Sequence, residues 1–191
     1  MSAMNFDFKK FKEELVLATK NAFLEIIKVN KDEIIYAFAL NCSSNVKSIG
    51  IIANTKDKLN DIVGESKNDF WYYKFCPEEW KIWNGADDEF YRIGNKLKAF
   101  QEENKNRISD SETNVYTYFF QEFREKIFDV CIDALSELNE EEFFVNNSKE
   151  GIELNFWVSE FLDEEESIDI FSKLNNGKIV DEYREHIAEI L

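Results

Sequence analysis

The residue types that could carry catalysis are few and far apart. His186 is the only histidine, and its predicted helix places it beside the apolar stripe, which favours a surface position. A serine or cysteine nucleophile usually needs such a base, and no serine lies in a Gly-x-Ser-x-Gly elbow. We therefore assign no catalytic residue, and a nucleophile that works without histidine stays open.

The cysteines and glycines argue against further kinds of site. Cys42, Cys76 and Cys131 are widely spaced and contain no Cys-x-x-Cys pair, which argues against a disulfide framework and a zinc site. The 6 glycines are too dispersed for a Walker loop or a dinucleotide-binding loop. We expect no metal and no cofactor, and we expect a reducing compartment.

Carboxylates are abundant, but their positions have a structural explanation. Residues 87–89 and 163–166 precede or open predicted helices, where negative charge complements the helix dipole. A carboxylate- or metal-dependent enzyme of unknown substrate stays as an alternative, although the EF-hand pattern is absent. Such an enzyme would need Asp and Glu side chains that converge in a concave pocket with raised pKa values.

The most unusual feature is an aromatic stretch, Phe70–Trp83, with carboxylates in it and just after it. Its rings either form a core or contact a partner, since Trp and Tyr are common in protein interfaces. The stretch has no Lys/Arg-lined groove, which argues against base stacking. The candidate partner-binding residues are Trp71, Tyr73, Glu78, Glu79, Trp80, Trp83, Asp87 and Asp88.

Periodicity predicts the elements that position these residues. Apolar spacings of three and four predict a helix over 6–28, and an apolar run on both faces predicts a central strand over 33–40. A strand over 47–53 completes an antiparallel hairpin. Residues 70–75 are predicted to be extended, and they are followed by a short helix at Pro77 and a helix from Asp87. A long helix over 112–138 is predicted to begin at a Ser109–Glu112 capping box, and a half-exposed strand over 151–159 follows it. The last two predicted helices span 167–174, with Gly177 at the C-cap position, and 180–190.

These elements predict an α+β fold, in which a small, mainly antiparallel sheet of about four strands packs against several helices in a single domain, 1–191. The formal net charge of −16 repels nucleic acid and anionic membranes and attracts a basic protein, or it merely keeps an aromatic-rich chain in solution. Neither a signal peptide nor an apolar run long enough to span a membrane is visible, so we expect a cytoplasmic protein.

Several sequence segments resemble those of one bacterial family. Tyr36–Leu40, Ile49–Thr55 and Cys76–Trp80 follow in the order of the domain of unknown function 4303 family, and 151–161 and 166–175 resemble its C-terminal part. The resemblance covers nearly the whole chain and implies no catalytic residue. Pro77–Gly85 is also faintly similar to the SUKH immunity superfamily, but the strand order differs, so that fold is not transferred.

The leading hypothesis is a non-enzymatic protein-binding module. The family resembles small acidic proteins found beside bacterial toxins, which implies an immunity protein that neutralises a basic toxin. The second hypothesis is the carboxylate enzyme. The third is a small-ligand-binding regulatory module, which would show a sizeable apolar pocket lined by tryptophans. The oligomeric state cannot be derived from these residues.

Overall fold

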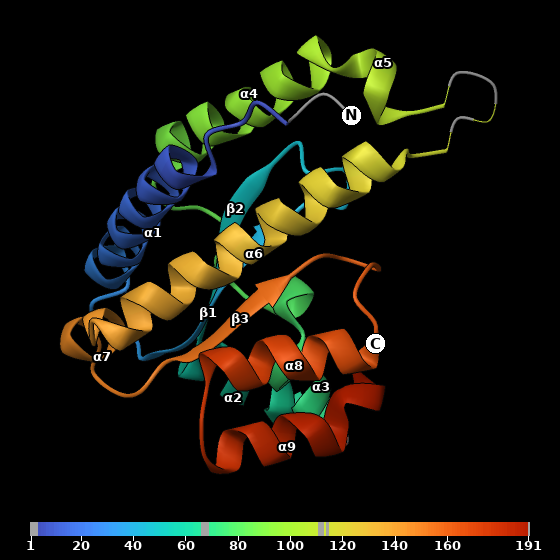
Figure 1. The fold of residues 1–191 in the computed structure, drawn as a ribbon. Helices are drawn as coiled ribbons and strands as arrows, with labels where there is room; N and C mark the ends of the chain where they lie inside the picture. The colour runs from blue at the N-terminus through green and yellow to red at the C-terminus, as the bar shows by residue number, and fades with distance from the viewer. Residues whose placement is uncertain (1–3, 66–68, 111–112, 114, 191) are drawn as a thin grey trace.

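The computed structural model describes residues 4–65, 69–110, 113 and 115–190, and its centre is a sheet of order β2-β1-β3 (Figure 1). The predicted hairpin is confirmed, because β1 (Ile35–Cys42) and β2 (Ile49–Thr55) pair antiparallel. The third strand, β3 (Glu153–Trp157), lies parallel to β1. The α+β class is confirmed, with a mixed sheet of three strands in the described part of the chain.

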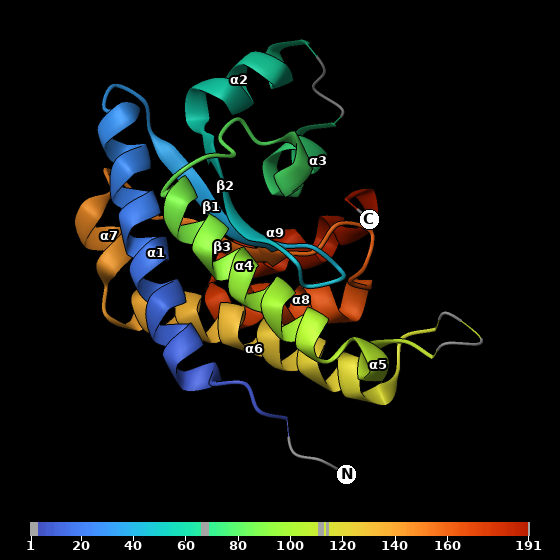
Figure 2. The ribbon, with the colours of Figure 1, turned by 90° about the horizontal axis from the view of Figure 1, so that it is seen from above.

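Three long helices pack on one face of this sheet (Figures 1 and 2). They are α1 (Phe8–Val29), α4 (Asp87–Glu103) and α6 (Tyr118–Glu140). Phe38 and Leu40 of β1 point into this core, as the alternation of a strand requires. Short helices α5 (Lys105–Ile108) and α7 (Phe143–Asn147) flank the two ends of α6.

The second face carries the shorter elements. They are α3 (Phe70–Phe75), the 3-10 helix η2 (Pro77–Glu79), α9 (Lys178–His186) and the 3-10 helix η3 (Ile187–Glu189). Helix α2 (Lys56–Glu65) follows β2, and α8 (Glu164–Leu174) lies beside β3. At this edge the Asn175 side chain accepts from the backbone N–H of Leu154 (2.8 Å) and donates to its carbonyl (2.7 Å). In the described ranges, no helix is long and apolar enough to cross a membrane.

Two predicted elements differ in the structure. The stretch predicted to be extended, residues 70–75, is helix α3, because its apolar side chains meet the sheet at helical spacing, with Trp71 and Phe75 stacked one turn apart. This removes the fourth strand. Strand β3 is buried rather than half-exposed, because α9 and α3 cover the face that carries Asn155 and Trp157.

Several helix ends also differ. Helix α6 begins at Tyr118, and the N-cap is Thr117, whose side chain accepts from the N–H of Phe120. Ser109 instead forms an antiparallel bridge with Tyr116, and Glu112 lies outside the described residues. Gly177, with φ 71°, precedes α9 as its N-cap, while α8 ends at Leu174 and has Asn175 as its C-cap.

Candidate functional site

The aromatic stretch forms mostly core. Phe75 is buried, and Trp80 is 5% exposed. The Trp80 Nε1 donates to the Lys74 carbonyl (3.2 Å), and its ring centroid lies 6.5 Å from that of Tyr36 on β1. The Trp80 ring is therefore occupied by contacts within the chain.

The other candidate partner-binding residues are spread over different environments. Trp71 is half-buried and stacks on His186, with ring centroids 4.3 Å apart, so this histidine is half-buried rather than on the surface. Tyr73 is half-buried, while Trp83 is 47% exposed. The remaining four, Glu78, Glu79, Asp87 and Asp88, are exposed.

Behind these aromatics lies an ionic cluster that the sequence did not predict. The Nζ of Lys74 on α3 lies 3.1 Å from Glu182 Oε2 on α9 and 3.5 Å from Glu153 Oε1 on β3. Burial raises the pKa of Glu153 from 4.5 to about 7, and the nearby Lys74 charge offsets only part of this effect. The other oxygen of Glu153 is buried and has no hydrogen-bond partner among the described residues. One signal in the sequence could have indicated this cluster. Glu153 lies within a strand, and a glutamate in a sheet that is covered on both faces is buried.

The cluster joins α3, β3 and α9. Tyr183 of α9 is buried against β3, and this burial raises its pKa to about 12. Four hollows of the described surface can be compared with this cluster, and none of these four is lined by Lys74, Glu153 or Glu182. No group of three or more potential metal ligands occurs in the described parts of the chain.

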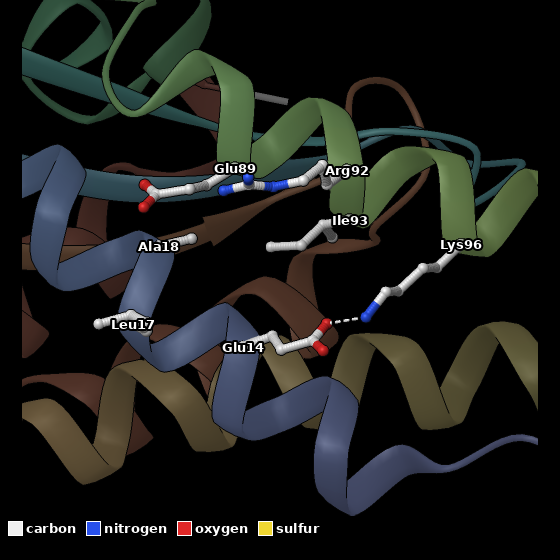
Figure 3. A pocket seen from close by; sticks show the side chains of 7 residues that line it. All are labelled: Glu14, Leu17, Ala18, Glu89, Arg92, Ile93 and Lys96. Atoms are coloured by element: carbon white, nitrogen blue, oxygen red, sulfur yellow. Dashed lines mark hydrogen bonds and ion pairs between the residues drawn. The ribbon is translucent and has the colours of Figure 1, made fainter.

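The first hollow lies between α1 and α4 and has a volume of about 280 Å³ (Figure 3). Leu17, Ala18 and Ile93 form its apolar part. Its rim is charge-balanced: Glu14 forms an ion pair with Lys96, and Glu89 faces the same opening as Arg92 (Figure 3). Such a rim selects neither a cationic nor an anionic partner.

A second hollow, of about 450 Å³, lies beside Trp83 at the turn end of the β1–β2 hairpin. No charged residue lines it, and Trp83 is its single tryptophan. Asn41 and four serines contribute most of its polar lining. It therefore differs from the apolar, tryptophan-lined pocket that a small-ligand module would show.

The acidity of the chain is strongly asymmetric. Residues 1–110 contain 18 acidic and 17 basic residues, whereas residues 111–191 contain 21 acidic and 6 basic residues. The aromatic stretch thus lies in the nearly neutral part. Almost all of the acidic excess lies on α6 and the elements after it, and a count of charges by region would have shown this from the sequence alone.

The excess is densest on what we term the α6–α8 surface, defined as Tyr118, Glu122, Glu125, Asp129 and Asp133 of α6 together with 160–166 before and in α8. The five α6 residues recur at spacings of three and four and so share one face of that helix. Helix α6 packs against α8, and the Asn139 Nδ2 donates to the Leu174 carbonyl (3.1 Å).

Few of these carboxylates have a cationic partner. Glu122 pairs with Lys126 (2.8 Å), and Asp163 and Glu166 form the capping box of α8. Within the described part of the chain, no ion pair involves Glu125, Asp129, Asp133, Glu160, Glu164 or Glu165. These carboxylates therefore produce a negative electrostatic potential over the α6–α8 surface, which a basic protein surface would neutralise.

Comparison with known proteins identifies the family of this chain. A family model described as a domain of unknown function (DUF4303) matches residues 15–176, which confirms the resemblance seen in the sequence. No curated protein and no solved structure matches the chain.

Proposed function

Because the chain belongs to the DUF4303 family, whose function is unknown, we propose from its surface that it is a non-enzymatic module that binds a basic protein. The observation that carries the proposal is the excess of 15 acidic over basic residues within 111–191. An immunity protein that occludes a cognate basic toxin is the specific form of this function that we favour.

The physical basis is long-range attraction followed by close pairing. Exposed carboxylates without cationic partners, such as Glu125, Asp129 and Asp133, produce a negative potential over one side of the molecule. This potential accelerates the approach of a basic partner and orients it toward α6 and α8. These carboxylates can then form ion pairs with the partner without breaking ion pairs within the chain, so binding does not cost the energy of existing pairs.

One observation favours the alternative of a carboxylate enzyme. Glu153 has a pKa near 7, a value suited to a general acid or base. However, its side chain lies between α3, β3 and α9, and Lys74 occupies one of its oxygens. None of the four hollows described above is lined by Glu153, which makes the acidic surface the stronger basis for a function.

The test uses the purified product of the neighbouring gene, which the proposal requires to be a basic protein. We expect a one-to-one complex whose association rate falls at least tenfold between about 50 mM and about 500 mM salt, since salt screens the attraction of exposed charges. A lack of binding at the lower salt concentration would remove the proposal. Enzymatic turnover that disappears in Glu153→Gln would favour the alternative.

A further inference from the structure

The hollow beside Trp83 lies on the second face of the sheet, where the cover of that face ends. Ala39 and Ile52, a cross-strand pair on this face, are fully buried. Side chains alternate along a strand, so the pair two residues further on, Asn41 and Gly50, lies on the same face. Both residues are only partly buried, and both line the hollow. The sheet is therefore accessible from this side at the turn end of the β1–β2 hairpin.

Gly50 is an unusual residue for its position inside a strand. A glycine there destabilises the strand and often marks a bulge, a bend or a place where a backbone or a ligand comes close. The pairing of β1 with β2 is regular at Gly50, whose φ is not positive, and the irregularity lies at the other end, between Ile35 and Ala37. A Cβ added to Gly50 would meet no atom of the described residues within 4 Å, apart from its chain neighbours. Close approach of a ligand is the explanation that these observations leave.

Trp83 gives the hollow a fixed aromatic side. Its Nε1 donates to the Trp80 carbonyl (2.9 Å), which holds the indole in one orientation, and 47% of Trp83 remains exposed. The indole has a single hydrogen-bond donor, and this bond already uses it. The Trp83 side chain can therefore contribute only apolar ring surface to a ligand in the hollow.

The polar lining of the hollow is uncharged, and most of its side chains have no partner. The groups that make no hydrogen bond within the described part of the chain are the Asn41 carboxamide and the hydroxyls of Ser44, Ser48 and Ser159. Ser43 differs, because its hydroxyl accepts from the backbone N–H of Ser48 (3.1 Å) and so holds the turn. Carboxamides and hydroxyls can both donate and accept hydrogen bonds. An ion in this hollow would lose hydration without gaining a charged partner, so the lining favours a neutral, polar ligand.

We propose that this hollow binds a neutral carbohydrate, with a pyranose ring over Gly50 and against Trp83. A pyranose combines C–H groups, which make favourable contact with the negative face of an aromatic ring, with hydroxyls that both donate and accept. These hydroxyls match the Asn41 carboxamide and the serine hydroxyls of the lining. The volume of about 450 Å³ falls within the range of about 300–1,000 Å³ found for small-molecule sites. This site does not depend on the proposed binding of a basic protein.

The test is an NMR titration of the ¹⁵N-labelled protein with four probes, the methyl glycosides of glucose, galactose, N-acetylglucosamine and glucosamine. We expect at least one of the three neutral glycosides to bind with a Kd of about 1 mM or lower. The resonances of the Trp83 indole N–H and the Asn41 carboxamide should shift on binding. The glucosamine glycoside, which is cationic at mildly acidic pH, should bind at least about fivefold more weakly than the best neutral probe, because no group in the hollow compensates its charge.

Substitutions at two glycines give a matched pair of variants. Gly50→Val fills the hollow and should reduce the affinity at least about tenfold, while the fold is retained, because the added side chain enters open space and valine favours a strand. Gly151→Val is the control: a Cβ there also meets no atom of the described residues within 4 Å, and Gly151 does not line the hollow, so the affinity should not change. Trp83→Ala should reduce the affinity as strongly as Gly50→Val, because it removes the aromatic contact.

Three results would overturn the carbohydrate site. The first is that no neutral glycoside shifts these resonances at about 10 mM, tenfold above the expected Kd. The second is that Gly50→Val binds as tightly as the wild type, which would place any bound sugar elsewhere. The third is that the glucosamine glycoside binds most tightly, which would mean that the net negative charge of the chain, and not the hollow, selects the ligand.

Discussion

The aromatic stretch Phe70–Trp83 and the α6–α8 surface both combine rings with carboxylates, but they use them in opposite ways. In the first, Phe75 and Trp80 face the sheet and α9. In the second, Tyr118 reaches solvent on the face of α6 that also carries Glu125 and Asp129, which form no ion pair within the described part of the chain. Local density of aromatics and acids therefore does not identify a binding surface. The tertiary neighbours of each side chain decide whether it stabilises the fold or contacts a partner.

The largest expected difference between the two regions concerns stability. Trp80→Ala should lower the free energy of unfolding by about 3–5 kcal/mol, because it removes a buried indole and leaves a cavity beside Tyr36. Tyr118→Ala, at an exposed site, should change it by less than about 0.5 kcal/mol. Urea denaturation measures both values. Similar losses for the two variants would contradict the contrast drawn between core and surface.

The second prediction concerns the ionic cluster beneath the aromatic stretch. Burial raises the pKa of Glu153 to about 7, so the native protein retains a proton that the unfolded chain releases near pH 4.5. The stability that this proton provides is complete below about pH 4.5 and is lost as the pH rises to about 7. The Glu153→Gln variant does not show this loss of stability, because its side-chain amide does not titrate.

The measurement is the difference in unfolding free energy between Glu153→Gln and the wild type from pH 4 to 8. This difference should grow in favour of the variant by up to about 3 kcal/mol between pH 4.5 and 7, then stay level. The difference between the two proteins removes the pH-dependent contributions of the carboxylates that both proteins share. A difference that does not change with pH would show that Lys74 fully compensates the burial of Glu153.

The third prediction compares carboxylates in the two halves of the chain. Glu125→Gln/Asp129→Asn/Asp133→Asn should slow association with a basic partner by roughly tenfold at low salt, because it weakens the steering field. Asp88→Asn/Glu102→Gln/Glu103→Gln on α4 makes the same change of charge in the nearly neutral half and should have a much smaller effect. Stopped-flow measurements separate the two, and equal slowing would mean that net charge alone matters.

Much of this fold was predictable, because periodicity reports burial. The stripes of α1 and α6 and the two apolar faces of β1 gave the core and the hairpin. Residues 70–75 were harder, because five aromatic residues in a run of six fit a helix and a strand equally well. Glu153 and Lys74 lie far apart in the chain, so only the parallel β1–β3 pairing and the packing of α9 bring them together.

The smallest predicted effect concerns the first turn of α6. Thr117 caps α6 and lies between Tyr116 and Tyr118, so Thr117→Ala should cost about 1 kcal/mol of stability. Ser109→Ala is the matched control, since Ser109 does not cap α6, and it should cost less than about 0.5 kcal/mol. Thermal unfolding measures both. Equal losses of stability in the two variants would mean that the Thr117 side chain contributes nothing as a cap.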